Sequence, residues 1–272
     1  DHIYGVANRM KVWSRGSPSE ELAGFAHDPG KFRTLWQGYL DNPLARKGEV
    51  AHSPTGVELI YRLSENYLKT HKKTIGFYVA KESLMYAVAA HHGMFDIVSA
   101  DGKGEFHGRM QRAHQDEVSQ YQEAIQNYQK EFSMEYLEEL FAKSVKEADE
   151  LVEKIVNKDS LKSASRFYFG FQARMILSSL IDGDWSDAGS FSSEKLRRYE
   201  SEQKKVDWEK LLLNLEIAVK AMSEESEINY LRNQISEECK RSAKKPPGIY
   251  RLNVPTGGGK TLAVMRFALA HA

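Results

Sequence analysis

Apolar residues recur with the period of an α-helix over most of this chain. The clearest pattern covers residues 135–157. Its apolar residues share one helical face: Leu137, Leu140, Phe141, Val145, Ala148, Leu151, Val152 and Ile155. Residues 165–181 are apolar almost all round, which predicts a central, buried helix that ends at Asp182. The sequence up to about residue 240 therefore predicts an all-α domain.

The pattern changes at the basic, proline-containing stretch 244–248. Residues 249–254 alternate between apolar and polar, which predicts a strand. A glycine-rich loop follows, and then an apolar helix from Leu262 onward. This order is typical of a phosphate-binding loop, in which a strand is followed by a glycine-rich loop, Lys-Thr and a helix. The predicted nucleotide-binding residues are Thr256, Gly257, Gly258, Gly259, Lys260 and Thr261.

The amino-acid composition limits the classes of protein to which this chain can belong. The 272 residues carry a formal net charge of zero, so a nucleic-acid contact would have to be local. A single cysteine, Cys239, excludes an intrachain disulfide and suits a reducing, cytoplasmic compartment. No apolar run is long enough to predict a membrane span. Because the chain starts at Asp1 and stops at Ala272 inside an expected helix, we expect a fragment.

An adjacent histidine and aspartate, His27 and Asp28, offer an imidazole and a carboxylate at one point of the backbone. Pro29 and Gly30 end the helix before them, and Lys31 adds a cation. A carboxylate can bridge two divalent ions, and hydrolysis of a phosphodiester with two metals needs that bridge and several neutral imidazoles. Further candidate ligands stand at the ends of expected elements: His2, His52, His91, His92, Asp182 and Asp184.

Each histidine alone is more often an ordinary core or surface residue, but two adjacent imidazoles are costly to bury without partners. Asp182 and Asp184 point about 200° apart on a helix, so we expect only one to reach the metals. We favour Asp184, with Asp182 supporting the ligands or capping a turn. Asp28 and Lys31 are the predicted catalytic residues, with Lys31 as a point charge on the phosphate or water.

The ordered combination of these motifs resembles the nuclease–helicase family of type I CRISPR systems, cut shortly after the first helicase motif. The likeness extends over most of the chain, and stretch 173–187 is most similar to subtype C. The residues that carry it are His2 with Val6 and Ala7, Ala26 to Lys31, His52-Ser53, His91-His92-Gly93, Ala173-Arg174-Met175, Asp182-Gly183-Asp184 and Val254 to Leu262. Pro29 and Gly183 depart from the family pattern, which expects an aliphatic residue and alanine there.

The resemblance implies an all-α HD-phosphohydrolase-like domain that carries one or two divalent transition metals. The first strand, P-loop and helix of a truncated RecA-like α/β helicase domain would follow it. The implied division is a nuclease domain at 1–206, a helical connector at 207–245 and the helicase fragment at 246–272. His2, His27, Asp28 and Asp184 would hold one metal. The other would be held by His52, His91 and His92, with Asp28 as the bridge. Manganese, iron, nickel and cobalt all suit such ligands.

By the same resemblance, metal-activated water would cleave single-stranded DNA as endonuclease or exonuclease. The implied partners are single-stranded DNA and the RNA-guided Cascade complex, with a CRISPR inhibitor as a further candidate. We expect a cytoplasmic monomer without membrane contact. ATP and magnesium would serve only the intact helicase, because a Walker B acid and a second RecA-like domain do not fit after Thr261.

Two alternatives stay open. An HD-fold nucleotide phosphohydrolase would act on mononucleotides, although the attached P-loop argues against it. A non-catalytic docking module would use the ligands structurally and bind Cascade or an inhibitor. Residues 94–114, with Lys103, His107, Arg109, Arg112 and His114, predict an irregular, mobile loop near the site. We expect the basic and aromatic residues of this stretch to contact DNA.

Overall fold

The computed structural model describes residues 2–40, 52–93, 102, 104–156, 162–194, 206–221 and 226–272. Contacts divide the chain into two compact units, residues 1–198 and residues 199–272, and each is described by itself. The expected division at residues 206 and 245 stays a prediction. The described residues are helical with connecting turns and contain no β-strand, which confirms the all-α class of the larger part.

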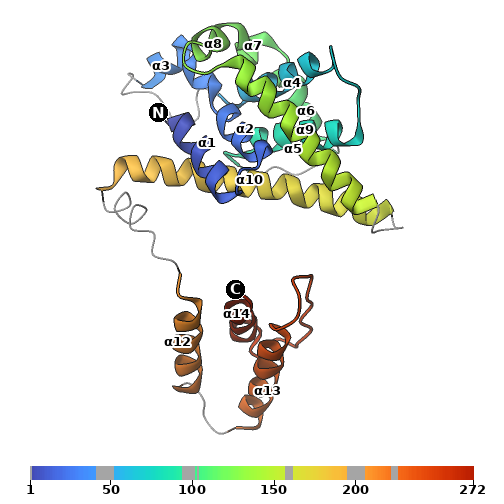
Figure 1. The fold of residues 1–272 in the computed structure, drawn as a ribbon. Coiled ribbons are helices and arrows are strands. Elements are labelled where there is room, and N and C mark those ends of the chain that lie inside the picture. The colour runs from blue at the N-terminus through green and yellow to red at the C-terminus, as the bar shows by residue number, and fades with distance from the viewer. Residues whose placement is uncertain are drawn as a thin grey trace. The chain divides into compact units, whose positions relative to one another are not determined.

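The first unit is a bundle of helices of very different lengths (Figure 1). Its elements are α1 (His2–Trp13), α2 (Pro18–Ala26), the 3₁₀ helix η1 (Pro29–Phe32), α3 (Thr34–Leu40), α4 (Ser53–Tyr67), α5 (Ile75–Ala90), α6 (Glu105–Ala113), α7 (Asp116–Ser119), α8 (Tyr121–Tyr128), α9 (Met134–Val156) and α10 (Lys162–Ser192). Helix α9 matches the expected stripe, because Leu137, Leu140, Phe141 and Val145 are all buried.

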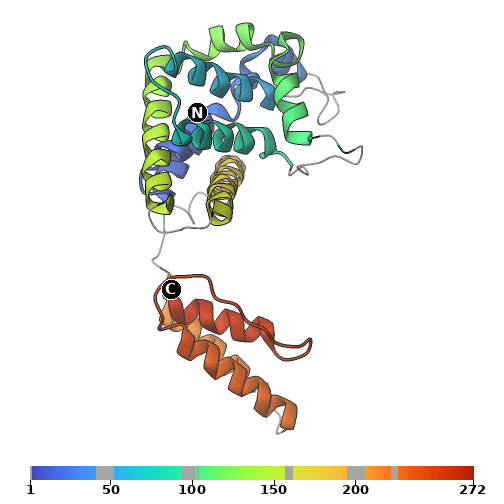
Figure 2. The ribbon, with the colours of Figure 1, turned by 90° about the vertical axis from the view of Figure 1, so that its right-hand side faces the viewer.

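The central helix is α5. It packs against α4, α9 and α10, and Figure 2 shows it crossing beside α10, which is seen nearly end-on. Most of its side chains are buried, among them Phe77, Leu84 and Val88. Thr74 caps the helix by accepting a hydrogen bond from the Phe77 amide at 3.0 Å, which satisfies one of the free N–H groups of the first turn.

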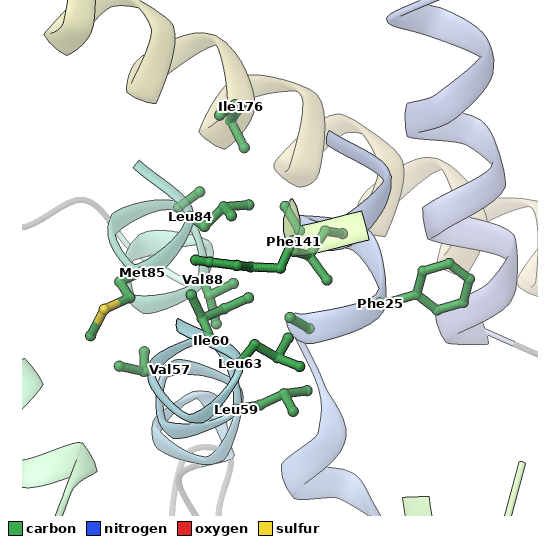
Figure 3. Packing of buried hydrophobic residues seen from close by; sticks show 14 of the residues in the cluster. Phe25, Val57, Leu59, Ile60, Leu63, Leu84, Met85, Val88, Phe141 and Ile176 are labelled. Atoms are coloured by element: carbon green, nitrogen blue, oxygen red, sulfur yellow. The ribbon is translucent and has the colours of Figure 1, made fainter. Parts of the chain in front are cut away.

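The core lies between these helices. Figure 3 shows Ile60 and Leu63 of α4, Val88 of α5 and Phe141 of α9 converging on one another. Burial of such large apolar side chains stabilises the fold by roughly 1.5–3 kcal/mol each. This packing fixes α4 and α5 relative to α2, and the ends of these three helices carry the candidate ligands.

Helix α10 differs from the expectation in length and in burial. It runs from Lys162 to Ser192 without ending at Asp182, and Phe167, Phe171 and Met175 on it are exposed. Only one face, with Ile176, Leu177 and Leu180, enters the core. The prediction of a helix buried all round was wrong, because an apolar composition does not require burial and the buried central position belongs to α5.

The irregular loop expected at 94–114 is also corrected in part. Residues 105–113 form α6, in which Met110 and Ala113 are buried. Residues 94–101 and 103 lie outside the described residues, as does the expected polar loop at 41–51. No helix of the described chain is both long and apolar enough to cross a membrane.

The second unit contains α12 (Trp208–Ala221), α13 (Glu227–Ser242) and α14 (Lys260–His271). Arg266 of α14 joins the three helices, because it lies 3.1 Å from Glu216 of α12 and 2.7 Å from Glu237 of α13. Its guanidinium is largely enclosed, so it contributes more than an exposed pair would.

The strand expected at 249–254 is wrong. This segment has no regular secondary structure, because a strand needs a neighbouring strand and the described residues supply none. The turn and the helix after it are present. Gly257 and Gly259 adopt positive φ angles of 85° and 78°, Arg232 donates a hydrogen bond to the Gly257 carbonyl, and α14 begins at Lys260. Without the strand, the phosphate-binding order is incomplete, and nucleotide binding by residues 256–261 stays a prediction.

Candidate metal centre

Most of the expected ligands of the first unit come from the ends of four helices, and Asp184 lies within α10. His2 begins α1, and His27 and Asp28 stand in the turn after α2. His52 is the N-cap residue of α4, and His91 is the C-cap residue of α5. Packing of α1, α2, α4 and α5 brings these ends together, although His2 and His91 are 89 positions apart in the sequence.

Two groups of candidate ligands result, and they share one aspartate. The first contains Asp28, His52, His91 and His92, and the second contains His2, His27, Asp28 and Asp184. Within each group, one ligand atom from every residue lies within 4.8 Å of the others. These are the two sets that the family resemblance implied. The shared carboxylate is the arrangement that a pair of bridged divalent ions requires.

The tautomers of two buried histidines favour metal binding. His27 Nδ1 lies 2.7 Å from the Gly24 carbonyl, and His91 Nδ1 lies 2.7 Å from the Val88 carbonyl. A carbonyl can only accept a hydrogen bond, so each Nδ1 carries the proton and each Nε2 presents a lone pair. Both Nε2 atoms are buried without a hydrogen-bond partner in the described structure. Unsatisfied buried acceptors are costly, and a cation between them would satisfy them.

Asp28 occupies the middle of the centre and is fully buried. Its Oδ2 lies 3.1 Å from His27 Nε2, and its Oδ1 lies 3.1 Å from His52 Nε2 and 3.7 Å from His91 Nε2. Burial opposes ionisation, but the neighbouring imidazoles, His27 first and then His52 and His91, outweigh it and hold the pKa of Asp28 well below its usual range. The carboxylate is therefore charged and faces both histidine groups.

His2 is oriented by a residue that sequence reasoning missed. Its Nδ1 lies 2.8 Å from Asp187 Oδ2, and its Nε2 lies 3.1 Å from Asp184 Oδ1. The hydrogen bond to Asp184 is the main cause of the raised pKa of His2. Burial of the ring acts in the opposite direction, and the hydrogen bond to Asp187 raises the pKa further. A carboxylate behind a ligand histidine fixes the tautomer and raises the basicity of the ring. The sequence feature that could have identified Asp187 is its spacing of three residues from Asp184, which puts both on the same side of a continuous helix.

His92 and His52 close the other side of the centre. Their Nε2 atoms are in contact, and the His91 and His92 ring centroids lie 3.9 Å apart. Partial burial of the ring, followed by repulsion from His91 and His52, lowers the pKa of His92 to about 4. This imidazole is thus neutral at physiological pH, as a metal ligand must be.

Two predicted residues take different positions around the centre. Lys31 forms an ion pair with Asp28 Oδ2 and is partly exposed, so its charge lies at the edge of the site. Asp182 does not join either group. It is exposed on the opposite side of α10 from Asp184 and lines a groove with Trp13 and Trp185. The prediction that it supports the metal ligands was wrong, because a 200° rotation on a continuous helix turns it away.

One close backbone approach holds the two groups together. A Cβ atom built on Gly30 would lie 2.3 Å from the His52 carbonyl oxygen and 2.8 Å from its Cα atom. The turn that bears Asp28 can thus approach the start of α4 only if residue 30 has no side chain. Gly30 has an ordinary φ angle, so its role is this contact and not the turn geometry that we expected.

No protein-family model matches the chain, and no curated protein matches it. The case for a metal centre therefore depends on the geometry of the chain itself. That geometry can hold a metal ion in each group of ligands, with Asp28 common to both.

Proposed function

We propose that the chain is a metal-dependent nuclease that hydrolyses single-stranded DNA. The observation that carries this proposal is the convergence of buried ligand atoms, namely the Nε2 atoms of His27 and His91, which have no hydrogen-bond partner, and the two carboxylate oxygens of Asp28. Such a ligand set, with imidazoles predominating over carboxylates, suits manganese, iron, nickel or cobalt. The motif order that resembles the type I CRISPR nuclease–helicases supports the choice of substrate.

When bound, a pair of divalent ions lowers the pKa of water and polarises a phosphoryl oxygen. The residues of the chain prepare the site for this chemistry. The Gly24 and Val88 carbonyls hold the protons of His27 and His91 on Nδ1, away from the centre. Asp28 stays ionised between the two groups, and Lys31 supplies a positive charge that would contact a phosphate oxygen at the partly exposed edge.

The biological setting is part of the same proposal. The chain would act in the cytoplasm in type I CRISPR interference, as a monomer recruited through the RNA-guided Cascade complex. An inhibitor of CRISPR interference would be a further partner. These statements depend on the resemblance of His27-Asp28, His91-His92 and the later glycine-rich loop to the family pattern.

Degradation of covalently closed, single-stranded circular DNA tests the proposal. The circle should disappear with Mn²⁺, Ni²⁺ or Co²⁺, and persist with EDTA or with the isosteric variant Asp28→Asn. The matched control is Asp182→Asn, which removes an exposed carboxylate from α10 outside the centre and should cleave normally. An intact circle with every metal, from folded and metal-loaded protein, would contradict the nuclease proposal and favour mononucleotide hydrolysis or docking.

A further inference from the structure

A small cavity lies beside the metal centre, between α4, α5, α6 and α7. Its volume is about 220 Å³, which is below the roughly 300 Å³ of the smallest pockets for drug-sized ligands. Its apolar wall is formed by Val57, Ala89 and Val118, and its polar lining includes Ser53, Arg109 and Arg112. The size and the lining suit one phosphate with its attached sugar.

The cavity shares its backbone segments with the metal ligands. Ser53 follows His52 directly, so their Cα atoms are about 3.8 Å apart. Ala89 precedes His91 by two residues at the end of α5, which is a rise of about 3 Å along a helix. The lining of the cavity thus begins one residue after His52 and includes the residue two positions before His91.

The charge of the cavity favours an anion. Arg109 is positioned by its Nη1 donating to the Ala89 carbonyl at 2.9 Å, and it lies 3.5 Å from Glu105. Arg112, one turn further along α6, is exposed. The first turn of α4 also lines the cavity, and a helix N-terminus carries partial positive charge. Guanidinium groups bind phosphate oxygens through paired, charge-assisted hydrogen bonds.

We propose that this cavity binds a phosphodiester group of single-stranded DNA next to the group that is cleaved, with Arg112 as its main phosphate contact and Arg109 as its second. This rests on the proposed nuclease function. It assigns to α6 the role of positioning the strand, while the reacting phosphate belongs to the ligands around Asp28. The two arginines are thus positioning residues, and their loss should act on DNA binding before it acts on the chemistry.

The binding test uses the full chain in EDTA, so that no cleavage occurs. Fluorescence anisotropy with fluorescein-labelled oligothymidylate gives the Kd over a series of NaCl concentrations. Arg112→Gln should raise Kd about threefold to tenfold and flatten the salt dependence by about 0.7 in log Kd per log[NaCl], the loss of one phosphate contact. The matched control is Arg174→Gln, an exposed arginine of α10 away from the cavity, which should leave both quantities unchanged.

Steady-state kinetics separate an effect on DNA binding from an effect on the cleavage step. With Mn²⁺, Arg112→Gln should raise KM for single-stranded DNA and leave kcat nearly unchanged. The small diester bis(4-nitrophenyl) phosphate has no neighbouring phosphate, so its hydrolysis should not change. Arg109→Lys keeps the charge and should retain more DNA affinity than Arg109→Gln. Circular dichroism of each variant checks that α6 still folds.

These experiments distinguish failure of the cavity proposal from failure of the nuclease proposal. If Arg112→Gln binds DNA with the affinity and salt dependence of the unchanged chain, or if Arg174→Gln weakens binding as much, the cavity proposal is overturned while the nuclease proposal stands. If thymidine monophosphate, and not the oligonucleotide, binds in an Arg112-dependent manner, the polymer assignment is overturned. If the unchanged chain neither binds nor cleaves single-stranded DNA, both proposals fall.

Discussion

His2 Nδ1 lies 2.8 Å from Asp187 Oδ2, so a residue of the first turn of α1 is held by one from the last turns of α10. The same imidazole presents Nε2 to Asp184 at 3.1 Å. This carboxylate–histidine pair is the kind of support that metal ligands commonly have, and it makes α10 part of the centre.

Asp187→Asn should weaken binding of Mn²⁺ about 10- to 100-fold, because the neutral amide no longer fixes the tautomer and basicity of His2. Competition with a fluorescent chelator measures this affinity. Asp182→Asn, on the same helix but outside the centre, serves as the control and should bind Mn²⁺ normally. Equal affinities for both variants would show that Asp187 does not support a ligand.

Gly30→Ala should destabilise the fold by about 1–3 kcal/mol, since its Cβ atom would press on the backbone of His52. Urea unfolding of the metal-free chain measures the loss. The control is Gly38→Ala in α3, where a Cβ atom meets nothing within 4 Å and should add up to about 1 kcal/mol of stability. A neutral Gly30→Ala would mean that the two ligand segments do not approach so closely.

Acid should destabilise the metal-free chain through His92. Its pKa is about 4 in the folded chain, against an ordinary value of 6.5, so between these pH values the unfolded chain binds a proton that the folded chain does not. Stability is therefore fully present above pH 6.5 and falls as the pH drops toward 4. Thermal unfolding across this range should show a smaller decrease for His92→Asn than for the unchanged chain. An identical decrease would contradict the lowered pKa.

Truncation of a side chain to alanine should affect stability differently on the two faces of α10. Leu180→Ala removes a fully buried side chain and should cost about 2–5 kcal/mol. Phe171→Ala removes an aromatic ring that is 54% exposed and should change the stability of the metal-free chain much less. Chemical denaturation of both variants checks this contrast. A larger loss for Phe171→Ala would mean that the exposed face is covered.

The sequence was most informative where one property decided the structure. The stripe at 135–157 predicts α9 because one face alone is apolar, and Leu137, Leu140 and Phe141 are buried on it. The candidate ligands were found because His27-Asp28 and His91-His92 stand next to turn residues at helix ends. Composition did not distinguish α5 from α10, since both are apolar and only tertiary packing decides which of them is central.

The errors have local causes. Ending the helix at Asp182 concealed Asp187, which lies on the continuation of α10 to Ser192. The strand at 249–254 was inferred from a short alternation, but alternation cannot supply the neighbouring strand that a β-ladder needs. Basic residues of 94–114 were expected to contact DNA, but the cavity beside Ser53 was not foreseen, because Arg109 and Arg112 come from α6, in a stretch that read as an irregular loop.

The most direct test of the centre is the Mn²⁺ content of the chain and of Asp28→Asn after equilibrium dialysis. Because Asp28 belongs to both ligand groups, the unchanged chain should retain Mn²⁺ in each group, and the single substitution should remove it from both. Dialysis of Asp182→Asn in parallel provides the control. Equal Mn²⁺ retention by Asp28→Asn and the unchanged chain would contradict a metal centre built around this carboxylate.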